Sequence, residues 1–294
     1  MMKNSLSKKR GLKKIKRKID ESRVKVQILK QRSKIKHILN LKDKKKKISE
    51  EYIKTGIPGF DELFENGIPK GTSCLIAGGP GSGKTIFCLQ ILNHAASEGE
   101  KALYISLEES ENRLKDHLYN FGFKPDELEK SGFLRIKKVD PFNISRNVEA
   151  LLAKAKGELK MKIEAVSGLI PKDFIPKWVF IDSLTALESA FKIGEDNYRV
   201  YIEQLFRYFE KLGVNLFLIT ETESMPIKYS PSGVEEFLAD CVVVLYNVKK
   251  GNIRESAIEV LKLRGGKHQK KIVAMQITDK GMIVYPEQEV FSEL

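Results

Sequence analysis

The amino-acid sequence predicts an α/β fold, with a mainly parallel sheet flanked by helices and antiparallel strands added toward the C-terminus. Short apolar segments alternate with helical segments through the first two thirds of residues 49–294, which is typical of a parallel sheet covered on both faces. Several β-rich segments then follow one another, with turn residues at 251–252 and 280–281. A glycine-rich loop at residues 78–85 joins an apolar strand to an amphipathic helix.

The expected strands are short runs rich in β-branched, aromatic and other apolar residues. They cover residues 73–77, 102–106, 134–137, 178–181, 214–220, 241–248, 257–263, 273–278 and 282–285. The expected helices are mostly longer segments with apolar residues at helical spacing, and they cover residues 84–97, 111–121, 147–166, 197–212 and 234–238. The sequence contains no internal repeat, so each motif occurs once.

Charge divides the chain into two parts. Residues 1–48 contain 20 basic and 3 acidic side chains, a net charge of +17, whereas residues 49–294 contain 32 basic and 36 acidic ones, a net charge of −4. The first part has no aromatic residue and few apolar ones, so we expect a basic arm that is flexible or partly helical. Residues 49–294 are sufficient for one sizeable hydrophobic core, and we expect a single domain there.

The composition argues against membrane and secreted proteins. No apolar run approaches the roughly 20 residues that span a bilayer, and no apolar segment follows the basic start. We therefore expect no transmembrane segment and no secretory signal. Cys74, Cys88 and Cys241 are widely spaced and form neither a metal-binding pattern nor a disulfide framework. This use of cysteine favours a reducing compartment, and we expect a cytoplasmic protein.

Residues 78–85 form the most specific motif. They read Gly78-Gly79-Pro80-Gly81-Ser82-Gly83-Lys84-Thr85, the pattern G-x-x-x-x-G-K-T. Glycines let backbone N–H groups approach phosphate oxygens, and the helix that follows directs its positive end to the same place. We expect Lys84 to contact the β- and γ-phosphates of a nucleotide and Thr85 to ligate Mg²⁺. The flanking strand and helix argue against a glycine-rich loop without a ligand.

Acidic residues follow two of the expected strands. Asp182 comes after the apolar run 178–181, where a carboxylate that holds Mg²⁺ from the second shell is expected. The alternative is that Asp182 is the N-cap of a helix. Glu108 and Glu109 lie just beyond the strand at 102–106, where one of them could orient or deprotonate water. Spacing alone leaves a second interpretation open, in which Glu109 and Glu111 provide an acidic first helical turn.

With these motifs in place, residues 53–286 resemble the KaiC family of RecA-type ATPases, in its single-domain, archaeal form that also resembles recombinase paralogues. The matching segments are Thr55-Gly56-Ile57-Pro58-Gly59-Phe60-Asp61-Glu62-Leu63, Gly67-Ile68-Pro69-Lys70-Gly71, Glu108-Glu109, Ile181-Asp182-Ser183, Ile219-Thr220-Glu221, Gly233-Val234-Glu235-Glu236-Phe237-Leu238-Ala239-Asp240 and Leu261-Lys262-Leu263-Arg264-Gly265, with His268 beyond. The resemblance implies a RecA-like sheet, ATP and Mg²⁺ as cofactors, and a homo-oligomeric ring, such as a hexamer, with ATP between neighbouring subunits.

The resemblance also implies roles for individual residues. It favours Glu108 as the catalytic base, with Glu109 in support. It implies that Lys262 and Arg264 reach the γ-phosphate held by the adjacent subunit, as an arginine finger does. From the residues alone, this pair could also be an ordinary basic strand end on the surface.

The sequence departs from the family in three respects. The clock protein of the family carries two such domains and is phosphorylated on a Ser-Thr pair, whereas this chain has one domain and no hydroxyl residue at the matching segment 235–237. Self-phosphorylation of that type is therefore not expected. The arm, residues 1–48, has no counterpart in the family.

Thr220 and Glu221 lie where the family places a sensor of the γ-phosphate.

The basic arm contains 16 lysines and only four arginines. Lysine acts as a point charge, and without aromatic residues the arm cannot stack on bases. We therefore expect any nucleic acid to be bound through its phosphates, without sequence preference and with steep salt dependence. A solvated tail and contact with an anionic membrane surface are the alternatives.

Two functions follow from these features. The first is a Mg²⁺-dependent, oligomeric ATPase whose hydrolysis is coupled to binding of nucleic acid or a protein partner. The alternative is a nucleotide-dependent regulatory or recombination-accessory binding module that hydrolyses ATP slowly. The rate of ATP turnover, with and without nucleic acid, distinguishes the two.

Overall fold

A computed structural model describes residues 51–154, 166, 168–191, 195–230 and 232–290. The basic arm lies outside the described residues, as do residues 155–165 of the helix expected at 147–166. Residues from Tyr52 onward form one compact unit. Among the described residues, no helix is long and apolar enough to cross a membrane.

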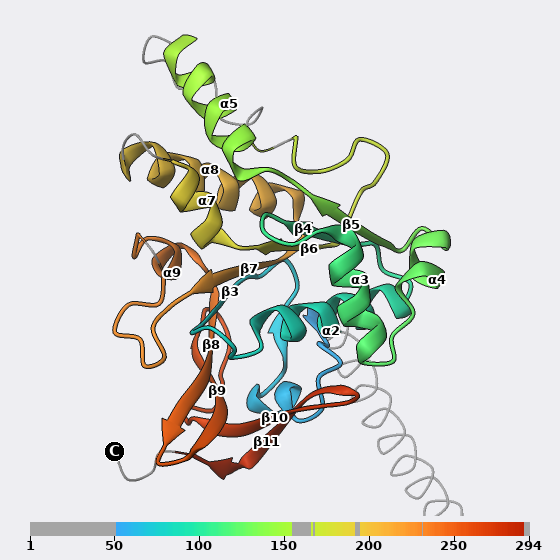
Figure 1. The fold of residues 1–294 in the computed structure, drawn as a ribbon, viewed down its shortest axis with the longest axis vertical. Coiled ribbons are helices and arrows are strands. Elements are labelled where there is room, and N and C mark those ends of the chain that lie inside the picture. Colours follow the sequence, from blue (N-terminus) through green and yellow to red (C-terminus); the bar gives the residue numbers. More distant parts are fainter. Residues whose placement is uncertain (1–50, 155–165, 167, 192–194, 231, 291–294) are drawn as a thin grey trace, which may run out of the picture. The chain divides into compact units, whose positions relative to one another are not determined.

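A nine-stranded sheet forms the centre of this unit, and its strand order is β11-β10-β9-β8-β3-β7-β6-β4-β5 (Figure 1). The strands are β3 (Ser73–Gly78), β4 (Ala102–Ser106), β5 (Leu134–Lys138), β6 (Trp178–Asp182), β7 (Asn215–Glu221), β8 (Cys241–Lys250), β9 (Ile253–Leu263), β10 (Val273–Thr278) and β11 (Gly281–Glu289). All strands from β8 to β5 pair in parallel, whereas β9, β10 and β11 are antiparallel. The predicted fold class is therefore confirmed.

Helices cover both faces of the parallel strands (Figure 1). One face carries α2 (Lys84–Ser97), α3 (Glu111–Asn120) and α4 (Pro125–Lys130), and the other carries α5 (Pro141–Lys154), α7 (Leu184–Ala190) and α8 (Glu195–Leu212). The remaining elements are short: β1 (Tyr52–Ile53), β2 (Ile68–Pro69), the 3₁₀ helix η1 (Phe60–Leu63) and α9 (Glu235–Leu238). Helix, strand and helix thus form three layers.

Side chains along the buried strands alternate between the two faces of the sheet, so each face has its own hydrophobic cluster. In β6, Trp178 and Phe180 pack into the hydrophobic cluster with α2, whereas Val179 and Ile181 pack into the cluster with α8. The rings of Trp178, Phe217 and Phe180 stack in sequence, with centroids 6.0 Å and 5.0 Å apart, and Tyr104 stacks on Phe180 at 6.0 Å. This aromatic row lies across the sheet on the face that α2 covers.

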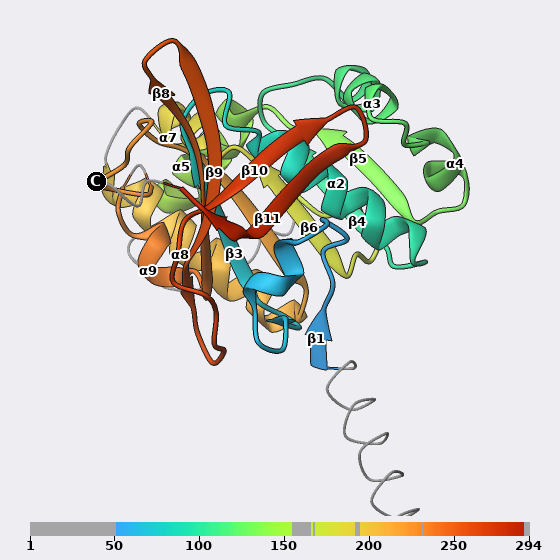
Figure 2. The same cartoon turned by 90° about the horizontal axis from the view of Figure 1, so that it is seen from below.

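The antiparallel strands extend the sheet beside α2 (Figure 2). Met282 and Val284 of β11 are buried in the same cluster as Phe60 of η1 and Phe87 of α2. The rings of Phe60 and Phe87 meet edge to face, with centroids 5.0 Å apart. The C-terminal hairpin therefore anchors the helix that begins at the glycine-rich loop.

Some helices differ from the prediction. The described part of α5 begins at Pro141, six residues before the expected start at Asn147, and proline is favoured in the first helical turn. Helices α4 and α7 were not expected, because six and seven residues are too few to show a helical period. The turn expected at 280–281 is formed one residue earlier, by residues 279–280 between β10 and β11, and Gly281 begins β11 with a φ of 105°.

Candidate nucleotide site

The glycine-rich loop joins the end of β3 to the start of α2, as the motif predicts. Gly81 and Gly83 have φ values of 74° and 94°, in the left-handed region that favours glycine. A Cβ atom at Gly78 would lie 2.5 Å from the Leu245 carbonyl oxygen and 2.6 Å from Ser82 Oγ. The loop therefore needs glycine both for its backbone conformation and for its close approach to β8.

Lys84 points back into this loop. Its side chain is buried, and Nζ donates a hydrogen bond to the Gly79 carbonyl oxygen at 3.1 Å. Burial lowers the pKa of Lys84, and nearby carboxylates oppose that shift. These carboxylates belong to Glu221, Asp182 and Glu108. The loop thus holds a buried cation that faces acidic side chains from three neighbouring strand ends.

Thr85 and Asp182 are in direct contact, although 97 residues separate them. The Thr85 hydroxyl donates to Asp182 Oδ2 at 3.1 Å, and the Tyr104 hydroxyl donates to the same oxygen at 2.6 Å. Burial raises the pKa of Asp182 to about 6, and both hydrogen bonds oppose the shift. A buried carboxylate with a raised pKa beside a phosphate loop is typical of a functional site.

Asp182 is not a helix N-cap. The N-cap of α7 is Ser183, whose Oγ accepts a hydrogen bond from the Ala186 N–H at 3.2 Å. The alternative interpretation of Asp182 is therefore wrong, because its carboxylate contacts the loop rather than the first turn of α7.

The donor set fits a Mg²⁺–nucleotide complex. Thr85 and Asp182 supply oxygen atoms, which Mg²⁺ prefers, and Mg²⁺ in nucleotide sites takes only one or two carboxylates together with phosphate oxygens. Within the described ranges, no group of three His, Cys, Asp or Glu residues could hold a metal alone. Ser82 Oγ in the loop and Thr220 Oγ1 on the neighbouring strand are buried, and neither has a hydrogen-bond partner among the described residues. Both are polar atoms that a bound phosphate or water could satisfy.

Glu108 and Glu109 follow β4 but have different partners. The Ser183 hydroxyl donates a short hydrogen bond to Glu108 Oε1, which places this carboxylate beside the end of β6. Glu109 Oε2 lies 3.1 Å from His117 Nε2 and 2.9 Å from Arg113 Nε, both on α3. The geometry brings Glu108 to the Asp182 side of the site and leaves Glu109 held by α3.

Lys262 and Arg264 lie away from the glycine-rich loop of their own chain. Lys262 pairs with Val242 near the start of β8, whereas Gly78 of β3 pairs with Leu245, three positions farther along that strand. Lys262 Nζ donates to the carbonyl oxygens of residues 236, 237 and 239, at 3.0, 3.3 and 2.6 Å. The cationic pair therefore caps helix α9.

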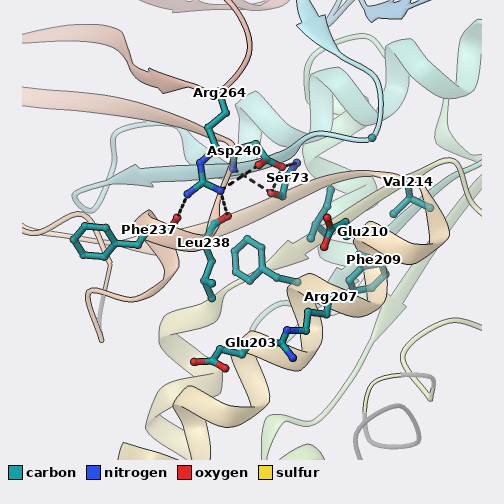
Figure 3. Close-up of a pocket in the computed structure, with 13 residues that line it drawn as sticks. Ser73, Glu203, Arg207, Phe209, Glu210, Val214, Phe237, Leu238, Asp240 and Arg264 are labelled. Carbon is teal, nitrogen blue, oxygen red and sulfur yellow. Dashed lines mark hydrogen bonds and ion pairs between the residues drawn. The ribbon is translucent and has the colours of Figure 1, made fainter.

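Figure 3 shows the surroundings of Arg264. Its guanidinium donates to the carbonyl oxygens of Phe237 and Leu238 at 2.5 and 3.3 Å, and it lies 3.5 Å from Asp240 Oδ1. These groups border a cavity of about 400 Å³ between α8, α9 and the start of β3. The cavity lies at the end of the sheet opposite the glycine-rich loop. Lys262 and Arg264 thus both hold backbone carbonyls of their own chain, and their action on a neighbouring subunit stays a prediction.

Thr220 and Glu221 end β7, next to Ala77 and Gly78 of β3. The Glu221 N–H donates to Thr185 Oγ1 at 2.9 Å. Both residues therefore lie beside the loop, where a phosphate sensor was expected.

The sequence did not indicate Tyr104, because an aromatic residue inside an apolar strand looks like any other core residue.

The fold and the loop define a P-loop nucleotide-binding protein with a RecA-like sheet. The family model described as "ATPase: KaiC" matches residues 53–289, so this chain belongs to the KaiC family of ATPases. Residues 53–289 accordingly form a RecA-like domain of this ATPase family.

Relatives of two lengths are similar to the chain. The "Circadian clock oscillator protein KaiC" of Acaryochloris marina is 32% identical over 249 residues, which are 83% of this chain and 46% of that protein. A "UPF0273 protein" of Thermotoga maritima is 31% identical over 240 residues, 80% of this chain and 96% of that protein. The chain thus spans less than half of the clock proteins it matches.

A solved structure agrees with the fold. The crystal structure of a KaiC-like protein from Pyrococcus horikoshii has a TM-score of 0.64 and 31% identity, and it covers 80% of this chain and 99% of its own.

Proposed function

We propose that this chain hydrolyses ATP in a Mg²⁺-dependent reaction, as a subunit of a homo-oligomeric ring with ATP at its subunit interfaces. The observation that carries the proposal is that four side chains from three separate parts of the sequence meet at one end of the parallel sheet: Lys84 and Thr85, Glu108, and Asp182. The catalytic domain would comprise residues 49–294, with residues 1–48 as a separate arm.

Each side chain has a role that its contacts support. The loop N–H groups and Lys84 would bind the β- and γ-phosphates, and Lys84 would then exchange its bond to Gly79 for phosphate oxygens. Thr85 and Asp182 would hold Mg²⁺. When bound, Mg²⁺ neutralises charge on the phosphates. Glu108 would take the proton from the attacking water, and the Ser183 hydroxyl, which donates to Glu108 Oε1, would orient this carboxylate.

Lys262 and Arg264 would serve a neighbouring subunit. Gly78 and the residue that pairs with Lys262 are three strand positions apart, or about 10 Å along the sheet, and Arg264 lies farther still. Both side chains donate to carbonyl oxygens at α9 instead of reaching the loop of their own chain. Arg264 is the better candidate for stabilising transition-state charge in trans, because its side chain is 54% exposed.

Substitution of Glu108 tests the base. We expect Glu108→Gln to lower ATP turnover at least about 100-fold with nucleotide affinity retained. Glu109→Gln is the matched control, since it changes the adjacent carboxylate that α3 holds, and its effect should be smaller. Turnover by Glu108→Gln close to that of wild type would overturn the assignment.

Mixing of inactive subunits tests the shared site. Lys84→Ala removes the cation of the loop, and Arg264→Ala removes the cation proposed to act in trans. In mixtures, some interfaces combine an intact loop with an intact Arg264, so we expect partial recovery of turnover. Mixtures that stay as inactive as the separate variants would argue against shared sites.

The basic arm favours a second candidate function, a nucleotide-dependent binding module with slow hydrolysis. A net charge of +17 in 48 residues suits phosphate-rich partners. Turnover that is low and unaffected by nucleic acid would favour this alternative. In either case we infer a cytoplasmic location, which the three free cysteines support.

A further inference from the structure

A buried tyrosine reaches the acidic residue of the nucleotide site from the neighbouring strand. Tyr104 of β4 lies one strand from Asp182 of β6, and its hydroxyl donates to Asp182 Oδ2 at 2.6 Å. Its side chain is fully buried, and its ring stacks on Phe180 with an interplanar angle of 14°. The ring is therefore held by the aromatic row, so the direction of the hydroxyl is set by packing.

Oδ2 of Asp182 accepts two hydrogen bonds from different elements. Thr85 on α2 donates to it at 3.1 Å, and Tyr104 on β4 donates at 2.6 Å. Two donors on one oxygen fix the plane of the carboxylate, and the shorter bond comes from the more rigid side chain. Without the tyrosine hydroxyl, Thr85 would be the one remaining hydrogen-bond donor to the Asp182 carboxylate among the described residues.

We propose that Tyr104 is a positioning residue that orients Asp182 for Mg²⁺ binding. The inference rests on the proposed function of Thr85 and Asp182 as the magnesium-holding pair. Groups that hydrogen-bond to a metal-binding carboxylate fix its orientation, and their loss typically costs about 10- to 100-fold in metal affinity or activity. Tyr104 would act only through Asp182, without contacting the nucleotide.

The test variant is Tyr104→Phe, which keeps the ring and its stacking on Phe180. Tyr198→Phe is the matched control, because the Tyr198 hydroxyl donates to a different buried carboxylate, Glu235 Oε1, also at 2.6 Å. Each variant loses one hydrogen bond of equal length between a buried tyrosine and a buried carboxylate. Only Tyr104 adjoins the candidate magnesium site.

The measurement is the affinity for a fluorescent ATP analogue as Mg²⁺ is titrated, with a second series in EDTA. For Tyr104→Phe we expect a rise of about 10- to 100-fold in the Mg²⁺ concentration that gives half of the Mg²⁺-dependent increase in affinity. The affinity for the analogue in EDTA should stay within twofold of wild type. Tyr198→Phe should match wild type in both series. Mg²⁺ dependence of Tyr104→Phe within twofold of wild type would overturn the inference.

A double-mutant cycle separates positioning from general destabilisation. In an Asp182→Asn background, Tyr104→Phe should have no further effect on the Mg²⁺ titration, because the carboxylate through which Tyr104 would act is absent. Equal effects in both backgrounds would contradict the inference. A wild-type chain that binds the analogue equally with and without Mg²⁺ would overturn the proposed function itself, which is a different outcome.

Discussion

Gln90 and Met282 exchange two hydrogen bonds that join helix α2 to strand β11. Gln90 Nε2 donates to the Met282 carbonyl oxygen at 3.2 Å, and the Met282 N–H donates to Gln90 Oε1 at 2.7 Å. Both residues are buried. One side chain thus satisfies both backbone groups of Met282, and it attaches the C-terminal hairpin to the helix that follows the phosphate loop.

The first prediction concerns this pair. Gln90→Leu keeps the side-chain size but leaves a buried N–H and a buried carbonyl without partners. We expect the free energy of unfolding, measured by chemical denaturation, to fall by about 2–4 kcal/mol. Gln288→Leu on the exposed end of β11 is the control, and it should change stability by less than about 0.5 kcal/mol. A similarly small loss in Gln90→Leu would show that Met282 finds other partners.

The second prediction concerns the cap of α9. Lys262 binds three carbonyl oxygens, so Lys262→Met should lower the free energy of unfolding by about 1–2 kcal/mol. Arg264→Gln should cost less than about 1 kcal/mol, because that side chain is more exposed. Thermal and denaturant unfolding of the two variants checks this order, and a larger loss in Arg264→Gln would contradict it.

The third prediction concerns pH. The pKa of Asp182 is raised from 3.8 to about 6, so the folded chain binds more protons than the unfolded chain between these values. Stability should therefore fall as pH rises from 4 to 7, by up to about 3 kcal/mol relative to Asp182→Asn. The measurement is the free energy of unfolding across this range, without Mg²⁺ or nucleotide.

The control for the pH series is Asp116→Asn, which alters an exposed carboxylate on α3. Its pH dependence should follow that of wild type. Parallel curves for wild type and Asp182→Asn would show that burial does not perturb Asp182.

The fourth prediction concerns the basic arm. If residues 1–48 bind nucleic acid through phosphates, affinity should fall steeply with salt, and deletion of the arm should remove most of that slope. Replacing the four lysines at 44–47 by glutamine should reduce the slope by up to about four. Binding measured from low to moderate salt checks both variants. Unchanged affinity and slope after deletion would exclude the arm as the binding element.

Most of the sheet was predictable because buried strands are short apolar runs with sharp limits. Strands β4 and β10 and helix α2 have the predicted bounds. Short or irregular elements were not predictable, since α7 follows β6 after one residue and has too few residues for a period. The start of α5 was misplaced because residues 141–146 begin with proline and then alternate apolar with polar residues, which obscures the helical period.

The candidate site was predicted unevenly. The loop residues and Thr85 are adjacent in sequence and carry a specific pattern. The contacts of Asp182 with Tyr104, and of Glu108 with Ser183, join residues 78 and 75 positions apart. No local pattern indicates such pairs, so the sequence predicted neither the contact between Tyr104 and Asp182 nor the partners of Glu108 and Glu109.

Three features can be recognised without the structure, because each depends on residues close together in the chain: the phosphate loop, the strand–helix alternation and the division of charge. The strand order is known only from the fold, which places β3 between β7 and β8 and so sets which strand ends meet at the loop. The fold also places Arg264 beside the start of β3, at the end of the parallel strands opposite the loop. Pairing between distant strands is set by burial over the whole sheet, which no single segment encodes.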